Sequence, residues 1–293
     1  MQVTNTILMI RPVGFRMNEQ TAVNNFFQED LDIKNAEINL KAQKEFDGFA
    51  EILKSKGINV IVVNDTNEPD TPDSIFPNNW ISFHENGTVG LYPMFAENRR
   101  DERREDVLDI LENHGFIIND IVDYTSAEKD GFFLEGTGSI LLDRINKKAY
   151  CALSDRADEE LFIEFCEDFD YFPVVFTANQ SVDGKRMPIY HTNVMMCLGE
   201  TFSVICSDAI DNKKERKIVL DHLNNDGKEI IRISEQQMHQ FAGNMLQVLG
   251  KDNKRYLVMS SSAYNSLTQE QIKSLTKYSE IIHSSLETIE ACG

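Results

Sequence analysis

The feature that most constrains the fold of this chain is a repeated pattern of apolar runs, turn signals and amphipathic segments. Its clearest copy begins with "WISFHENGTVGLYPM" (80–94), in which two apolar runs flank the turn signal Asn86-Gly87. A helix is predicted over 99–115, because its apolar residues recur at helical spacing and Gly115 is a typical stop, and "FIINDIVDY" (116–124) is strand-like. One unit is therefore a strand pair, a helix and a further strand.

The same unit recurs along most of the chain. Further strand pairs are predicted at "SILLDRINKKAYCALS" (139–154), "NVMMCLGETFSVICS" (193–207) and "NMLQVLGKDNKRYLVMS" (244–260). A helix follows each pair, and the last of these helices is predicted over 268–286. The run "ILMIRPV" (7–13), a helix and "INVIVV" (58–63) supply part of a fifth unit, whose strand pair is expected beyond the carboxy-terminal residue.

The size of the unit limits how it can be stable. Five units in 293 residues are about 55–60 residues each, which lies within the range of repeat architectures. A unit this small cannot bury its own sheet face, so the units must pack around a common centre. We therefore expect an α/β fold in which residues 1–293 form one domain, a closed ring of five pseudo-symmetric units whose last unit is incomplete.

A short polar stretch stands at an equivalent place in each unit, before or at the start of the strand pair. These stretches are "FPNNW", "FLEGTGS", "YHTNV", "FAGNM" and "EACG". In a closed ring they would meet at one end of the central axis. Asn78 and Asn79 would then face a pocket shared with other units instead of the core.

Charge and composition exclude several classes of partner. The chain has 29 Lys and Arg residues against 48 Asp and Glu, a formal charge of −19, which argues against nucleic acid and anionic membranes. No apolar run of about 18 residues and no secretory signal pattern occurs, so a soluble, cytoplasmic protein is expected. The cysteines lack metal-ligand spacing, so buried thiols and no metal are expected; they are Cys151, Cys166, Cys197, Cys206 and Cys292.

Two residues in the polar stretches are candidates for acid–base chemistry. Glu135 lies beside Gly136 and Gly138, where it is either a turn glutamate that bonds local amides or a carboxylate that orients a substrate. His191 starts an apolar strand and is either a structural histidine or a general acid–base group.

Arginines are the candidates for binding an anion. Arg156 follows a strand at the start of a predicted helix, and Arg99 and Arg100 open the charged stretch "NRRDERRED". Each of them also has a plainer interpretation as a solvated surface side chain.

Taken in order, these motifs resemble those of the pentein superfamily, the guanidino-group-modifying enzymes. The matching residues are Phe76-Pro77-Asn78-Asn79, Arg99-Arg100-Asp101-Glu102, Glu135-Gly136-Thr137-Gly138, Ser154-Asp155-Arg156-Ala157 and His191-Thr192-Asn193. The stretches "FPNNW", "NRRDER" and "YHTN" are most similar to the branch of amidinotransferase-like or citrulline-utilisation hydrolases. The resemblance implies a five-bladed α/β propeller that uses a catalytic cysteine and no cofactor.

The resemblance also implies roles for the candidates. His191 would protonate the departing nitrogen and then activate water, while Glu135 would hold substrate N–H groups. Arg156, helped by Arg99 or Arg100, would pair with the α-carboxylate. The nucleophilic cysteine of the family ends a Gly-rich stretch, which would begin here at "EACG". We therefore expect the nucleophile beyond Gly293 and not at Cys292; a chain that ended at Gly293 would be expected to bind without catalysis.

The sequence departs from the family where arginine-consuming members have aspartates that grip a guanidinium. This chain has Asn79 and Asn193 there. Two carboxylates beside a neutral group would be buried without compensation, whereas an amide matches the donors and the acceptor of a ureido group. We therefore expect a thiol-dependent hydrolase that converts citrulline to ornithine, ammonia and carbon dioxide, with Asn78, Asn79 and Asn193 among its substrate-binding residues.

Two alternatives stay open. The first is an amidinotransferase or an arginine-deiminase-type enzyme, which begins from a cationic guanidino substrate. The second is a non-catalytic propeller that binds a partner, like the ribosome-associated translation factors of the same fold. For an enzyme, the expected partner is a small ureido or guanidino amino acid, and a homo-oligomer is left open.

Overall fold

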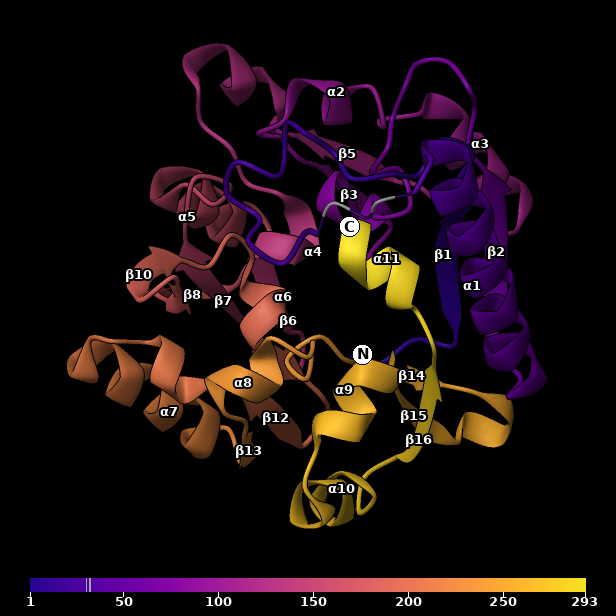
Figure 1. Ribbon diagram of the computed structural model, residues 1–293. Coiled ribbons are helices and arrows are strands. Elements are labelled where there is room, and N and C mark those ends of the chain that lie inside the picture. Colours follow the sequence, from indigo (N-terminus) through magenta and orange to yellow (C-terminus); the bar gives the residue numbers. More distant parts are fainter. Residues whose placement is uncertain (30, 32) are drawn as a thin grey trace.

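Three-stranded sheets with one shared topology dominate the structure, a computed structural model that describes residues 1–29, 31 and 33–293 (Figure 1). In each, an antiparallel pair is followed by a third strand parallel to its neighbour. Within the described residues these sheets are β3 (Ile81–Phe83), β4 (Thr88–Leu91) and β5 (Asp120–Asp123); β6 (Ile140–Asp143), β7 (Lys148–Leu153) and β8 (Phe172–Thr177); β11 (Met196–Leu198), β12 (Phe202–Ile205) and β13 (Glu229–Arg232); and β14 (Leu246–Leu249), β15 (Arg255–Ser260) and β16 (Glu280–Ser284).

Two smaller strand pairs complete the sheets of the described chain. β1 (Thr6–Arg11) pairs in parallel with β2 (Asn59–Asn64), and β9 (Asn179–Val182) forms a hairpin with β10 (Lys185–Pro188). The mixed α/β fold predicted from the repeat is confirmed.

Helices connect the parallel strands, as a parallel pair requires. α1 (Asn35–Ser55) joins β1 to β2 and buries one stripe at helical spacing, which includes Ala42, Phe46 and Leu53. The corresponding helices of the other sheets are α3 (Glu105–Asn113), α5 (Glu159–Asp168), α7 (Lys213–Asn225), and α9 (Ser261–Ser266) with α10 (Gln269–Leu275).

Two predicted helices are wrong in extent. The helix predicted over 99–115 is divided into α2 (Glu97–Arg100) and α3, and the break lets Arg99 and Glu102 turn their side chains inward. The helix predicted over 268–286 ends at Leu275, and β16 follows because its residues pair with β15. In both cases a tertiary contact overrides the local pattern.

Short helical turns stand at the start of the sheets, in the polar stretches. They are η1 (Pro77–Asn79), α4 (Gly136–Ser139) and α6 (Thr192–Met195), and α4 contacts both of the others. A further short helix, α11 (Glu287–Cys292), contacts α1. In Figure 1, α4, α6 and α11 lie nearer the middle of the view than the crossover helices. The first residues of three sheets are thereby brought together.

The first strands of the chain pack against the last sheet. Ile7 and Val60 contact a core cluster that contains Val248, Tyr256 and Ile282. The N–H of Leu249 also donates to the carbonyl of Thr4 at 2.8 Å. Within the described residues no strand hydrogen bonds join one sheet to the next, so the closed five-bladed ring stays a prediction.

A buried ion pair links two neighbouring sheets. Lys228, just before β13, lies 2.9 Å from the carboxylate of Asp143 at the end of β6, and neither side chain is exposed. The remaining ammonium hydrogens reach the carbonyls of Gly199 and Glu200 at 3.0 and 2.9 Å. Among the residues described, no helix is both long and apolar enough to cross a bilayer.

Candidate active site

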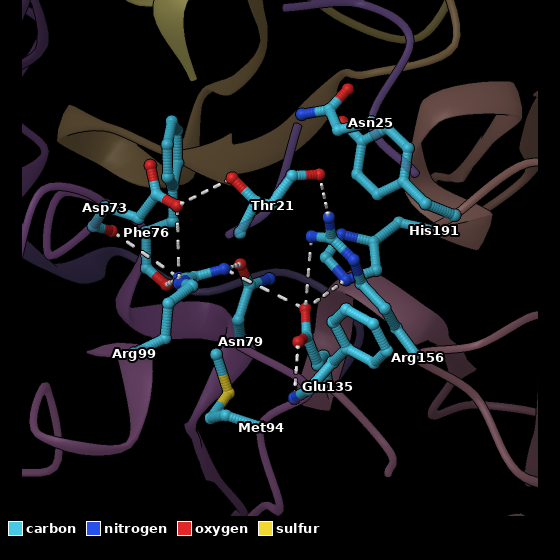
Figure 2. A network of polar contacts seen from close by, with 12 residues as sticks. Thr21, Asn25, Asp73, Phe76, Asn79, Met94, Arg99, Glu135, Arg156 and His191 are labelled. Atoms are coloured by element: carbon cyan, nitrogen blue, oxygen red, sulfur yellow. Dashed lines mark hydrogen bonds and ion pairs between the residues drawn. The ribbon is translucent and has the colours of Figure 1, made fainter. Parts of the chain in front are cut away.

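A buried carboxylate–imidazole pair lies where α4 and α6 meet. Glu135 immediately precedes α4 and His191 immediately precedes α6, so each side chain projects from the start of a helical turn. His191 Nε2 lies 2.7 Å from Glu135 Oε2, and Glu135 is fully buried (Figure 2). The structure thus brings together two residues that are 56 positions apart in the sequence.

Two buried arginines flank this pair. Arg156 Nη1 lies 3.6 Å and Arg99 Nη1 3.8 Å from Glu135 Oε2, and the N–H of Phe95 donates to Oε1 at 3.0 Å. Burial alone would raise the pKa of Glu135, but Arg156, His191 and Arg99 together lower it to about 2. Glu135 is therefore ionised at neutral pH.

His191 is neutral in the same environment. Burial, reinforced by the two arginine charges, lowers its pKa to about 4, although Glu135 opposes this shift. A neutral imidazole that donates from Nε2 to Glu135 has a free lone pair on Nδ1. That nitrogen is placed to accept a proton.

The backbone of Gly138 lies close to this nitrogen. A Cβ atom at this position would lie 2.5 Å from Asn79 Nδ2 and 2.8 Å from both Nδ1 and Cε1 of His191. Only a glycine lets these two side chains approach the backbone so closely. Asn79 and His191 consequently both occupy the space that a side chain at position 138 would need.

Asn79 accepts a hydrogen bond from Arg99, which is itself paired with Glu102 in the interior. Arg99 Nη1 donates to Asn79 Oδ1 at 2.8 Å, while its Nε and Nη2 donate to the two oxygens of Glu102 at 2.8 and 2.9 Å. Burial raises the pKa of Glu102 to about 7 despite the attraction of Arg99. Arg99 and Glu102 form a bidentate pair behind the site.

Asp73 is a site residue that the sequence analysis did not single out. Its Oδ2 accepts from Asn18 Nδ2 at 2.8 Å and from Thr21 Oγ1 at 3.3 Å, and lies 3.7 Å from Arg99 Nε. Its Oδ1 is buried with no hydrogen-bond partner among the described residues. A buried carboxylate oxygen without a donor is suited to an incoming cation.

Arg156 is fixed by a segment from the amino-terminal part of the chain. Its Nε donates to Asn24 Oδ1 at 3.0 Å and its Nη2 to the carbonyl of Thr21 at 3.0 Å. The guanidinium lies over the ring of Tyr190, 4.8 Å from the ring centre. Nη1 has no hydrogen bond in the described structure and faces Glu135, so it can donate to a ligand.

The same segment also holds the last residues of the chain. Gln28 Nε2 donates to the carbonyl of Cys292 and Asn25 Nδ2 to that of Gly293, both at 3.0 Å. Gly293 packs against the ring of Phe76, directly before η1. Residues 21–28 thus contact both Arg156 and the carboxy-terminal helix.

Three predicted substrate-binding residues lie outside the hydrogen-bonded network. The carbonyl of Asn78 accepts from the Thr137 hydroxyl at 3.3 Å, but its side chain has no hydrogen bond in the described structure. Arg100 turns away, with its Nε on the carbonyl of Met94. The Asn193 carbonyl accepts from Asn244 at 3.3 Å, and its half-buried side chain does not join the network within the described residues.

The cysteine side chains are buried in apolar surroundings. Burial raises the pKa of Cys197 to about 12 and that of Cys206 to about 11, which leaves them as thiols at neutral pH. Cys292 packs in an apolar cluster with Phe15, Ile38 and Ala42. The described residues contain no group of three or more His, Cys, Asp or Glu side chains that could hold a metal ion.

Two kinds of site residue were missed for different reasons. Glu102 stands in the motif Arg99-Arg100-Asp101-Glu102, so a local signal existed, but no role was derived for it. Asp73 and Thr21 carry no local pattern that distinguishes them from loop residues. Only the long-range contacts of the fold identify them.

Comparison with known proteins agrees with this fold. The family model and the structural neighbours place the chain in the pentein superfamily of guanidino-modifying enzymes, as the sequence motifs indicated. Within it, residues 11–293 match the family model described as N,N dimethylarginine dimethylhydrolase, eukaryotic, and the chain belongs to that family. No curated protein matches the chain in sequence.

Solved structures share the fold at low identity. ArgZ, an arginine dihydrolase from the ornithine–ammonia cycle in Cyanobacteria, is 16% identical with a TM-score of 0.74; the match covers 98% of this chain and 39% of ArgZ. The N-terminal domain of ArgZ, bound to substrate, is 16% identical with a TM-score of 0.70, covering 98% of this chain and 93% of that one. A dimethylarginine dimethylaminohydrolase adduct with S-methyl-L-thiocitrulline is 13% identical with a TM-score of 0.64, covering 99% and 95%.

Proposed function

We propose that this protein hydrolyses a C–N bond of a ureido or guanidino amino acid, with citrulline as the favoured substrate. The observation that carries the proposal is the buried Glu135–His191 pair, 2.7 Å apart, with Arg99 and Arg156 beside it. A neutral histidine next to an ionised, buried carboxylate is an arrangement suited to proton transfer in a water-poor site.

The unsatisfied groups of the site match the ends of an α-amino acid. Asp73 Oδ1, which is buried without a donor, would accept from the α-ammonium group. Arg156 Nη1 would donate to the α-carboxylate. Glu135 Oε2 has lone pairs left for substrate N–H groups, because a carboxylate oxygen accepts more than one hydrogen bond.

The chemistry proceeds through a thiol ester-like intermediate. The thiol of a cysteine gives its proton to His191 Nδ1, and the resulting thiolate adds to the ureido carbon. The C–N bond then breaks as His191 returns the proton to the departing nitrogen. Water, deprotonated by His191, attacks the carbon and breaks the C–S bond, which regenerates the thiol.

The thiol is proposed to come from residues that follow Gly293. The carbonyl of Gly293 accepts from Asn25, and its α-carbon lies against Phe76, next to the turn that carries Asn79. Residues that continue from there would begin close to the site. The ArgZ and dimethylaminohydrolase structures include a covalently bound reaction intermediate and an S-methyl-L-thiocitrulline adduct, respectively, which supports covalent chemistry in the superfamily.

The preference for citrulline depends on Asn79. An amide next to the substrate carbon suits a neutral ureido group, whereas a carboxylate would suit a guanidinium. The described structure supports this role for Asn79, which lies in the network, and gives Asn193 no comparable contact. Membership of the citrulline-utilisation branch is part of the same proposal.

A guanidino substrate is the second candidate. The family description names dimethylarginine, and the ArgZ structures are those of an arginine dihydrolase. An amidinotransferase would share the thiol step but pass the group to an amine instead of water.

The test uses the full-length protein with citrulline, arginine and dimethylarginine as separate substrates. Loss of each substrate and the products ornithine, citrulline, ammonia and dimethylamine are quantified for the wild type, His191→Asn and a control, His114→Asn, whose imidazole is exposed. We expect citrulline to have the highest kcat/KM and His191→Asn to lose at least about 100-fold, since general acid–base catalysis contributes about that much. A His191→Asn variant with the same kcat/KM as the His114→Asn control would contradict the mechanism. A higher kcat/KM for arginine or dimethylarginine than for citrulline would contradict the proposed substrate.

The architecture is proposed together with the function. The four similar sheets and the β1–β2 pair would form one domain over residues 1–293, with a closed five-bladed ring around the site. The packing of β1 and β2 against β14–β16 supports closure.

A further inference from the structure

The orientation of the Asn79 amide is set by chemistry. The atom of Asn79 that faces Arg99 Nη1 at 2.8 Å must be its oxygen, because a guanidinium has only donors. The amide nitrogen is therefore on the other side. It lies beside His191 above Gly138 and donates no hydrogen bond to the described residues.

We propose that Glu102, acting through Arg99, orients Asn79 so that its N–H group donates to an acceptor on the substrate, and that this makes the site select a ureido oxygen over a guanidinium. The inference rests on the proposed function for the location of the substrate's reacting carbon. Glu102 touches no substrate in this scheme and is a positioning residue.

Glu102 is the group that fixes Arg99 in this orientation. It takes up Nε and Nη2 through two hydrogen bonds of 2.8 and 2.9 Å, which leaves Nη1 for Asn79. Asp73 and Glu135 also attract Arg99, at 3.7 and 3.8 Å, but from different directions. Without the charge of Glu102, these two carboxylates would compete for the guanidinium, and the Asn79 amide would be free to turn over.

The consequence for selectivity is a matter of donors and acceptors. A ureido group presents a carbonyl oxygen, which accepts from Asn79 Nδ2. Every polar position of a protonated guanidino group is an N–H donor, so the same Asn79 N–H would face another donor. A site that leaves a donor unpaired discriminates against that ligand.

The experiment measures dissociation constants by titration calorimetry at about pH 8.5, where Glu102, whose pKa burial raises to about 7, is ionised. The full-length protein carries His191→Asn in every case, so that no ligand is hydrolysed during the titration, and wild type in this experiment means that protein with Glu102 and Asn79 unchanged. The ligands are citrulline, arginine and L-thiocitrulline, which is neutral like citrulline but has a sulfur that accepts hydrogen bonds weakly. The variants are Glu102→Gln, Asn79→Ala and the double variant. In the wild type we expect thiocitrulline to bind about two- to tenfold more weakly than citrulline, the worth of one hydrogen bond.

The sign of the effect separates this inference from simple electrostatics. If Coulomb attraction alone acted, removing the charge of Glu102 should weaken the binding of cationic arginine and so raise the preference for citrulline. We expect the opposite: in Glu102→Gln the preference for citrulline falls about two- to tenfold. In the Asn79→Ala background this fall should disappear, because the amide through which Glu102 acts is absent.

Two outcomes would overturn the inference. The first is an equal wild-type affinity for citrulline and thiocitrulline. The second is a preference for citrulline over arginine that rises or stays constant in Glu102→Gln, as it would if both ligands lost affinity equally through a purely structural role. The comparison of citrulline with thiocitrulline in the wild type tests the Asn79 hydrogen bond even if a variant does not fold. Failure of the unsubstituted full-length protein to hydrolyse citrulline would refute the proposed function, while these binding ratios would still decide the role of Glu102.

Discussion

Removal of the Glu135 charge should destabilise the protein strongly. In Glu135→Gln the side chain keeps its size but leaves Arg156 and Arg99, at 3.6 and 3.8 Å, without their shared carboxylate. Each contact corresponds to about 4–5 kcal/mol at an effective dielectric constant of about 20, and desolvation offsets much of this. Losing one partner of a buried ion pair costs about 3–5 kcal/mol net, a large part of a typical stability of about 5–15 kcal/mol.

The assay is urea unfolding followed by circular dichroism, with the free energy of unfolding obtained from the midpoint and slope. The matched control is Glu280→Gln, because Glu280 also lies between two cations, Lys56 and Lys254, but on the surface. We expect the control to be nearly unchanged, since solvent screens exposed pairs. A Glu135→Gln protein as stable as the control would refute the claim that Glu135 is ionised and paired in the folded state.

Three further changes have defined outcomes. Gly138→Ala places a Cβ 2.5 Å from Asn79 Nδ2 and should reduce kcat/KM by about 100-fold, because Asn79 and His191 are displaced. The control Gly48→Ala, where a Cβ would have no atom within 4 Å, should keep the wild-type kcat/KM. Similar kcat/KM values for the two variants would contradict the close approach at Gly138. The pKa of His191 is lowered to about 4, and its neutral form is the base, so kcat/KM should fall only as the pH drops toward 4. A pH profile in which kcat/KM falls around pH 6.5, the ordinary pKa of histidine, would contradict this. Lys228→Met leaves Asp143 buried without its cation and should cost about 3–5 kcal/mol in urea unfolding, which the added change Asp143→Leu should partly restore; no loss would show that the pair is not charged.

The sequence predicted the repeated unit and most of the centre of the site. Glu135, His191 and Asn79 stand in short polar stretches at equivalent places of the unit, so the repeat itself indicated that they converge. Arg156 lies outside these stretches, after a strand, and was indicated by its motif alone. The extents of the helices near 99–115 and 268–286 were not predictable from apolar spacing, because ion pairing at Arg99 and strand pairing at β16 decide them. These are contacts of the folded chain.

The parts of the site that were missed come from loops. The Thr21 carbonyl reaches Arg156 across 135 positions of sequence, and no local pattern in "NEQTAVNNFF" indicates that contact. Asn193 shows the opposite limit, since it matches a motif by position but its side chain lies outside the network within the described residues. A motif identifies which residue type stands at a position, and packing decides where the side chain lies.

The packing of the first strands on the last sheet has a consequence for synthesis on the ribosome. Leu53 and Ile58 share their core cluster with Val248, Tyr256 and Ile282, which are made much later. At about 5–20 residues per second, the α1–β2 segment would wait about 10–40 s with an apolar stripe exposed. This delay predicts that the nascent chain needs shielding by chaperones until the β14–β16 sheet has emerged, and that amino-terminal fragments aggregate when translation stalls before it.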